Sequence, residues 1–165
     1  DLAGSLKNLS NLLAEAGDCG GALKAAREVV GIYRGLAEGN PAAFNSKLAG
    51  SLNNLSNRLS GVGDRGGALD AIREAVEIRR GLSEENPGVF NPDLAASLNK
   101  LAVLLADVGD RGGVLKAARE AIKIYRRLAE EKSATFNPLL AMSLINFSNC
   151  LSGVGDRGGG CRDLS

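Results

Sequence analysis

The sequence predicts an all-α protein, an α-solenoid of stacked antiparallel helix hairpins with about seven helices. The first observation is a segment that recurs every 46 residues and opens at Leu2, Leu48, Leu94 and Leu140. The second is that apolar residues within each copy lie three and four positions apart, while no segment alternates as a strand does. A repeat of this length indicates helix hairpins that bury their apolar faces on their neighbours.

The repeat divides the chain into three full units and part of a fourth. We place these units at 1–47, 48–93, 94–139 and 140–165, within one repeat domain that covers 1–165. Three hairpins and one final helix are therefore expected. Because the chain begins at Asp1 and ends in GGGCRDLS, we expect it to be a fragment of a longer array.

Each unit is predicted to begin with a helix that ends in a glycine turn. In the second unit, four leucines form one apolar stripe: Leu48, Leu52, Leu55 and Leu59. A Gly-Asp pair follows, in which the glycine adopts a left-handed conformation and the aspartate caps the next helix. We expect this turn in every unit, at Gly17, Gly63, Gly109 and Gly155.

The second segment of each unit is predicted to form the longer helix. In the second unit it reads GGALDAIREAVEIRRGLSEE, with its apolar stripe at Ala68, Ile72, Ala75, Ile78 and Leu82. The stretch that follows, NPGVFNPD, is predicted to connect units, because proline can end one helix or begin the next. All four prolines fall in such stretches. The phenylalanines that recur there are expected to pin each connection to the core: Phe44, Phe90 and Phe136.

The turn sequence GVGDRGG at 61–67 also contains Gly61-x-Gly63-x-x-Gly66, the spacing that holds a dinucleotide pyrophosphate in Rossmann domains. The spacing has that meaning only between a strand and a helix, whereas here it follows a predicted helix. We therefore interpret it as a hairpin corner, and a nucleotide-binding enzyme is a remote alternative. Gly66 and Gly67 each cost a helix up to about 1 kcal/mol relative to alanine, and nothing in the sequence explains why the pair recurs.

The fourth unit contains a first helix but no second one. The final helix is expected over Leu140–Leu151, yet GCRDLS stands where the other units continue with an apolar helical pattern. The final helix would then expose some of Leu144, Phe147 and Leu151. Such a face invites a partner or another copy of the chain, so a self-assembling structural module, a homo-oligomer through uncapped terminal repeats, is an alternative function.

The composition favours a folded cytoplasmic protein without a cofactor. The net charge of +1 argues against nucleic acid and anionic membrane as partners, and no apolar run reaches the roughly 20 residues of a membrane span. Cys19, Cys150 and Cys161 fit neither a disulfide framework nor a metal site, which indicates a reducing compartment. The chain contains no histidine and no recognisable catalytic arrangement, so we expect no enzyme, no catalytic residue and no metal.

The repeats resemble those of the tetratricopeptide repeat (TPR) family, whose units span about 34 residues. Without a gap, Leu52, Leu55 and Leu59 fall on the aromatic and leucine positions of the first helix, and Gly63 meets the turn glycine. Ala68 and Ala75 meet the two alanines of the second helix. Arg80 departs from the pattern where a proline is expected, and the unit is about 12 residues longer. Long-unit relatives are similar, above all kinesin light chain, whose repeats share the run seen here as SLNKLAVLLADVGD. The resemblance implies a TPR-like superhelix.

In that family, first helices line a concave surface that holds peptides or partner helices. The resemblance therefore implies a protein–protein interaction scaffold that holds a peptide or partner helix through an asparagine-rich stripe, with a protein of unknown identity as partner. Asparagine is a middling helix former, but its amide both donates and accepts, which suits a peptide backbone of any sequence. The residues expected on this surface are Lys7, Asn11, Asn53, Asn54, Asn57, Asn99, Lys100 and Asn149.

Two narrower interpretations concern the same positions. Some family members grip a C-terminal carboxylate with a clamp that Lys7, Asn11, Asn54 and Lys100 match by type, but Ala96 replaces a further lysine, so the clamp is incomplete. Alternatively, the asparagines bond to the neighbouring hairpin and fix the packing between repeats.

Four arginines are expected on the solvated outer face of the second helices: Arg79, Arg80, Arg126 and Arg127. Ion pairs with Glu74 or Glu130 would add little stability there, because the partners are exposed to water.

Overall fold

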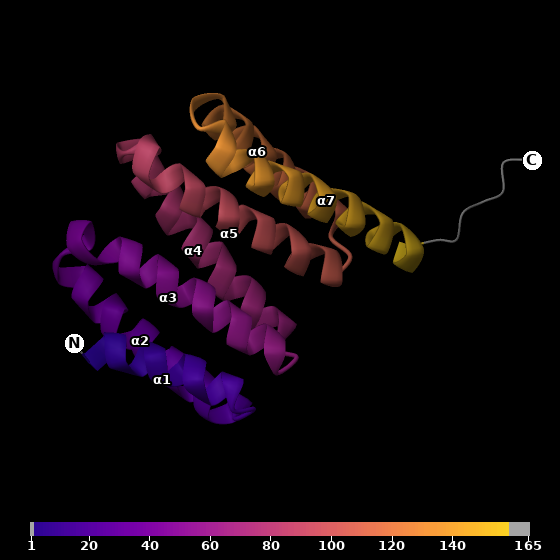
Figure 1. Ribbon diagram of the computed structural model, residues 1–165. Coiled ribbons are helices and arrows are strands. Elements are labelled where there is room, and N and C mark those ends of the chain that lie inside the picture. The colour runs from indigo at the N-terminus through magenta and orange to yellow at the C-terminus, as the bar shows by residue number, and fades with distance from the viewer. Residues whose placement is uncertain (1, 159–165) are drawn as a thin grey trace, which may run out of the picture. The chain divides into compact units, whose positions relative to one another are not determined.

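The computed structural model describes residues 2–158, which form seven α-helices and no strand (Figure 1). The helices are α1 (Leu2–Glu15), α2 (Cys19–Gly39), α3 (Pro41–Gly61), α4 (Arg65–Glu85), α5 (Pro87–Asp107), α6 (Arg111–Glu131) and α7 (Ser133–Gly158). They divide into two compact units, Asp1–Pro87 and Gly88–Ser165. Within the first unit, α1 packs on α2, α2 on α3 and α3 on α4. The predicted all-α architecture of helix hairpins is confirmed.

The hairpin turns form where the Gly-Asp pairs predict them. Gly17, Gly63 and Gly109 have φ angles of 83°, 83° and 77°, in the left-handed region that glycine enters without a steric penalty. The aspartate after each glycine caps the next helix by accepting a hydrogen bond from a backbone amide. In α4, the amide nitrogen of Gly67 lies 2.9 Å from Oδ1 of Asp64.

This cap explains one glycine of the recurring pair. A Cβ atom added at Gly67 would lie 2.6 Å from Oδ2 of Asp64, and one added at Gly113 would lie 2.5 Å from Oδ2 of Asp110. A side chain at this position would therefore displace the capping carboxylate. A Cβ at Gly66 would lie 3.9 Å from Oδ1 of Asp64, which is ordinary contact. Only the second glycine of the pair is required by the cap.

The proline-containing stretches are helical, which corrects the predicted connections. Pro41 and Pro87 are the first residues of α3 and α5, while Pro92 and Pro138 lie inside α5 and α7. A proline in the first turn loses no hydrogen bond, because the amides there have no partner within the helix. In the second and third hairpins the first helix is consequently as long as the second, since α3, α4, α5 and α6 each contain 21 residues. The prediction of a longer second helix was wrong there, whereas in the first hairpin α2, with 21 residues, is longer than α1, with 14.

The core of the first unit follows the predicted apolar stripes. Leu52, Ile72 and Ala75 are fully buried. Two serines join the helices of a hairpin: the hydroxyl of Ser10 donates to the carbonyl oxygen of Ala22 at 2.8 Å, and that of Ser56 donates to the carbonyl oxygen of Ala68 at 2.9 Å. The alanines let the backbones approach closely enough for these bonds.

In the second unit, Ala95, Tyr125 and Leu128 form a buried cluster. Phe136, which was expected to pin the connection between two units to the core, packs against this cluster. Burial and the charge of Asp93 raise the pKa of the Tyr125 hydroxyl.

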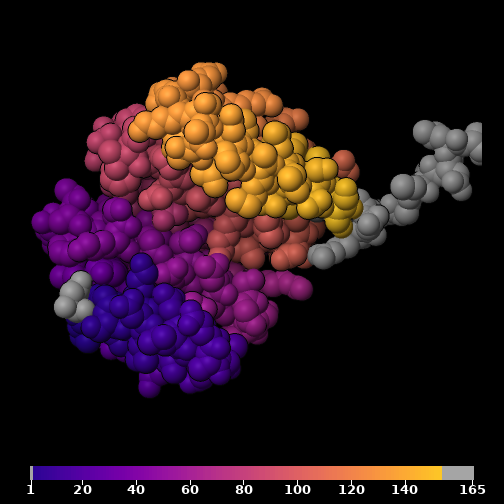
Figure 2. Space-filling view, in the orientation of Figure 1, coloured from indigo at the N-terminus to yellow at the C-terminus, as the bar shows by residue number. Residues whose placement is uncertain are grey.

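The last helix is longer than the sequence predicts. It spans Ser133–Gly158 instead of Leu140–Leu151, so Gly155 lies within a helix and not in a turn. α7 lies at the surface of the second unit (Figure 2). None of the helices within residues 2–158 has the length and apolar character needed to cross a bilayer.

Candidate functional site

The predicted site residues all lie on first helices of the hairpins, and each unit carries its own part of the set. In the first unit, α1 carries Lys7 and Asn11, and α3 carries Asn53, Asn54 and Asn57. In the second unit, α5 carries Asn99 and Lys100, and α7 carries Asn149. The side chains of Lys7, Asn57 and Asn149 are exposed, and the other five are half-buried. We refer to these two sets as the first-helix surface of each unit.

One asparagine of the first unit is engaged between helices. Nη2 of Arg58 on α3 donates to Oδ1 of Asn11 on α1 over 2.9 Å. Asn11 therefore joins two neighbouring repeats through this bond. The other buried nitrogen of the same side chain, Nε of Arg58, has no hydrogen-bond partner among the described residues.

Asn99 has the same kind of role in the second unit. The hydroxyl of Ser143 on α7 donates to Oδ1 of Asn99 on α5 over 2.7 Å. Ser143 is only 1% exposed, so this oxygen is the acceptor that satisfies a buried hydroxyl. The packing role that the sequence left open is thus found at Asn11 and Asn99.

Part of the proposed carboxylate clamp comes together in the first unit. Lys7 and Asn54 line one small gap with Ser10 and Ser51, and its volume of about 10 Å³ is near the minimum for a single water molecule. Asn11, the third matching residue of this unit, is committed to Arg58. Lys100 belongs to the second unit.

A larger pocket of about 330 Å³ opens between α5 and α7. Its lining residues combine amides, a carboxylate and small apolar groups: Val103, Ala106, Asp107, Asn146, Asn149, Cys150 and Gly153. The amides of Asn146 and Asn149 both donate and accept, and the carboxylate of Asp107 accepts only. The pocket is therefore suited to a ligand that presents N–H groups, such as a peptide backbone or a basic side chain.

The sequence-based set missed Asp107 and Cys150. Asp107 lies just before the hairpin turn, at the position that Glu15, Gly61 and Gly153 occupy in the other units. A carboxylate where two units have glycine was the sequence feature that could have identified Asp107 as a site residue. Cys150 is buried beside it, and burial together with the Asp107 charge raises the pKa of its thiol. Cys19 is exposed, and Cys161 lies outside the described residues.

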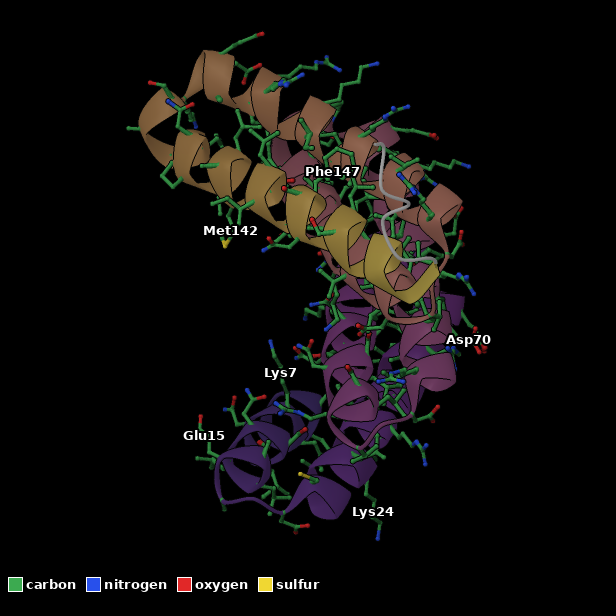
Figure 3. The ribbon with its side chains drawn as sticks, turned by 90° about the vertical axis from the view of Figure 1, so that its right-hand side faces the viewer. Lys7, Glu15, Lys24, Asp70, Met142 and Phe147 are labelled. Atoms are coloured by element: carbon green, nitrogen blue, oxygen red, sulfur yellow. The ribbon has the colours of Figure 1, made fainter. Side chains whose placement is uncertain are left out.

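Apolar side chains complete the first-helix surface of the second unit. Val103 and Ile145, which stand at positions that carry asparagine in other repeats, are exposed, and so is Met142. Figure 3 shows Met142 and Phe147 on opposite sides of α7, with Phe147 directed toward α6. The first-helix surface of this unit is thus both amide-bearing and apolar.

The glycine motif at 61–67 forms a helix–turn–helix corner. Gly61 ends α3, Gly63 forms the turn, and the Asp64 carboxylate accepts from the amide of Gly67 at the start of α4. A carboxylate already occupies the place where a phosphate would approach the helix. Among residues 2–158, no three His, Cys, Asp or Glu side chains gather as a metal site would require.

The ion pairs of the second helices differ from the predicted ones. Glu74 of α4 pairs with Arg34 of α2, with both carboxylate oxygens 2.8 Å from Nη2, and not with Arg79 or Arg80. Arg80 pairs with Glu77 one turn before it, at 2.8 Å. Glu74 and Arg80 are six residues apart, so they do not face each other on one helix, whereas the hydrogen bonds of Arg34 show that this residue lies beside Glu74.

The fold and the paired helices define a helical repeat protein, and comparison with known proteins gives the kind of repeat. The family model described as tetratricopeptide repeat matches residues 48–87 and 94–133. These two segments are tetratricopeptide repeats, and the resemblance inferred from the sequence is confirmed.

Two solved structures share the fold. BtubC (BKLC) from P. vanneervenii is 21% identical, with a TM-score of 0.74 over 94% of this chain, and the chain spans 57% of BtubC. MamA is 14% identical, with a TM-score of 0.51 over 94% of this chain and 80% of its own. At these identities the likeness shows the fold alone. No curated protein sequence matches the chain significantly.

Proposed function

We propose that the chain is a protein–protein interaction scaffold that holds a peptide or a partner helix on its first-helix surface. The pocket between α5 and α7 carries this proposal, because Asn146, Asn149 and Asp107 surround an opening of about 330 Å³ that Val103 makes partly apolar. A few convergent polar groups in a partly apolar hollow are typical of binding sites. The tetratricopeptide repeats and the non-enzymatic scaffolding common in that family support the same assignment.

The residues proposed for binding are those whose amides remain accessible. Asn57 and Asn149 are exposed, and Asn146 lines the pocket. Asn11 and Asn99 contribute indirectly, because they hold neighbouring first helices together. The acceptor-only carboxylate of Asp107 favours a segment with a basic side chain over one that ends in a carboxylate at this pocket.

Selection from a random peptide library against the full chain tests this proposal. We expect enriched peptides to lose about tenfold in affinity with Asn146→Ala and Asn149→Ala combined, because two hydrogen bonds of about 0.5 to 1.5 kcal/mol each are removed. Fluorescence anisotropy measures the affinity. Asn137→Ala is the matched control, since Asn137 is an exposed asparagine of α7 outside the pocket. Peptides that bind the double variant and the wild type equally would show that the pocket is not the site.

A specific observation favours self-assembly as a second candidate function. Leu12 and Leu9 on α1 are 62% and 46% exposed, and Leu2 is exposed beside them. The position of Leu2 is taken in α3 by Leu48, which is 5% exposed. α1 therefore presents an apolar face of the kind that another repeat covers elsewhere in the chain. Light scattering over a concentration range tests this role: a mass that rises and returns to monomer with Leu12→Glu supports it, and a constant monomer contradicts it.

A further inference from the structure

A second hollow, distinct from the α5–α7 pocket, lies between α6 and α7 and has a volume of about 490 Å³. Its apolar floor and its cationic rim come from seven residues: Arg119, Ile122, Lys123, Arg126, Arg127, Leu144 and Phe147. We call it the α6–α7 groove. All four cationic side chains are exposed, and none forms an ion pair with a carboxylate of the described residues.

The first unit contains the equivalent groove between α2 and α3, where it is covered by α4. Two repeats earlier, Arg34 of α2 occupies the position of Arg126, and Leu52 of α3 occupies that of Leu144. There, α4 packs on α3, and its Glu74 accepts two hydrogen bonds from Arg34. Leu52 is 1% exposed, whereas Leu144 is 40% exposed. The described residues provide no helix that covers the α6–α7 groove as α4 covers its counterpart.

We propose that the α6–α7 groove binds an acidic amphipathic helix of a partner protein, in the place that α4 takes in the first unit. Its apolar side would cover Leu144 and Phe147, and a carboxylate would meet Arg126 as Glu74 meets Arg34. This inference goes beyond the proposed function, because it concerns a different surface. The first-helix amides take no part in it.

The charge of the groove determines the chemistry of the partner. Lys123 and Arg127 stand where the filled groove has Gly31 and Gly35, so the open groove carries two more positive charges along its rim. A helix that complements it must be more acidic than α4. A second copy of this chain fits less well, because α1, the helix with an open apolar face, carries only Lys7 and Glu15 among its described charges.

A labelled peptide provides the probe. It has the α4 sequence, residues 65–85, with Arg79→Glu and Arg80→Glu, which makes it acidic while its apolar stripe stays intact. Its affinity for the full chain is measured by fluorescence anisotropy at about 50 mM salt, where screening of surface charges is weak. We expect saturable binding to the wild type. Leu144→Asp should weaken it at least about tenfold, and Arg126→Glu about fivefold.

A charge exchange tests whether residue 74 of the probe meets residue 126 of the groove. A probe with the further change Glu74→Lys should bind Arg126→Glu more tightly than it binds the wild type. Arg65→Glu is the matched control, because it makes the same charge change at the exposed start of α4, outside the groove. Asn146→Ala with Asn149→Ala should leave probe binding unchanged, which separates this groove from the pocket of the proposed function.

Circular dichroism and thermal melting establish whether each variant is folded. If Leu144→Asp does not fold, Arg126→Glu alone tests the proposal, because Arg126 is exposed and its replacement should leave the fold intact. The proposal fails if no probe binds at concentrations of about 1 mM, or if Arg126→Glu and Arg65→Glu weaken binding equally. A monomer–dimer equilibrium that Arg126→Glu abolishes would instead assign the groove to a second copy of the chain.

Discussion

Two adjacent glycines begin the second helix of each hairpin, and the structure assigns them different roles. Gly67 leaves room for the capping carboxylate of Asp64, whereas Gly66 meets nothing closer than 3.9 Å. We expect Gly66→Ala to raise the free energy of unfolding by up to about 1 kcal/mol through helix propensity. Gly67→Ala gains the same propensity but displaces a cap of about 1 kcal/mol. Urea unfolding should therefore rank Gly66→Ala above Gly67→Ala, and equal stabilities would contradict this account of the pair.

Asn99 and Asn149 are both first-helix asparagines, but among the described residues only Asn99 has a hydrogen-bond partner. Asn99→Ala leaves the buried hydroxyl of Ser143 without its acceptor, so we expect the free energy of unfolding to fall by about 1 to 3 kcal/mol. Asn149→Ala should change it by less than about 0.5 kcal/mol, because the side chain is exposed. Urea unfolding measures both. Adding Ser143→Ala to Asn99→Ala should recover part of the loss, and a double variant no better than the single one would argue against the bond.

Cys150 and Cys19 should react at different rates with an alkylating reagent. Burial and Asp107 raise the pKa of the Cys150 thiol, so at neutral pH it is both protonated and inaccessible, while Cys19 is exposed. Because the pKa of this thiol is higher in the folded chain than in the unfolded chain, its contribution to the free energy of unfolding is fully present below the unfolded-state pKa. That contribution is lost as the pH rises through the folded-state pKa. Peptide mapping after iodoacetamide treatment at about pH 8 should show Cys19 modified first. Asp107→Asn should speed the reaction of Cys150, and an unchanged rate would show that the carboxylate does not act on the thiol.

At the scale of single helices, the sequence predicts the hairpins well and their boundaries poorly. The leucine spacing and the Gly-Asp pairs specify α3, its turn at Gly63 and the start of α4, since each signal acts within one turn of helix. The proline stretches were misread because Pro87 is compatible both with a connection and with a first helical turn. Whether Gly155 forms a turn depends on a helix that would have to pack after it, which a local signal does not include.

The first-helix surface is likewise predictable from the sequence only in part. Helical periodicity is enough to place Asn99 and Asn149 on first helices, but their hydrogen bonds depend on how neighbouring helices stack. Asn11 and Arg58 are 47 residues apart, and Asn99 and Ser143 are 44 apart. Stacking also brings Asp107 into the α5–α7 pocket. No pattern within a single helix indicates such contacts.

At the scale of the whole chain, the repeats explain why one groove is filled and another is open. The second helices α2, α4 and α6 begin 46 residues apart, at Cys19, Arg65 and Arg111, and residues 2–158 contain no fourth. In repeat proteins, stability is approximately a sum of unit and neighbour terms. Within residues 2–158, α7 is followed by no second helix, so the stabilising contact that such a helix would make with α6 and α7 is absent there.

Adding a second helix after α7 should stabilise the protein and close the α6–α7 groove. We consider a chain in which a copy of residues 65–85 replaces residues 157–165, so that Asp156 can cap it as Asp64 caps α4 and Gly155 can form the turn. Covering Leu144 and Phe147 should raise the free energy of unfolding by about 2 kcal/mol or more, measured with urea.

The same chain should no longer bind the acidic α4 probe, because the fused helix occupies its place. A control fusion with Ile72→Asp and Val76→Asp inside the copied segment removes the apolar side of the helix, since both residues are buried in α4. It should neither add stability nor block the probe. Equal stabilisation by both fusions would mean that added length and not burial in the groove is responsible. A stabilised fusion that still binds the probe would place the probe outside the groove, because two helices do not fit on Leu144 and Phe147 together.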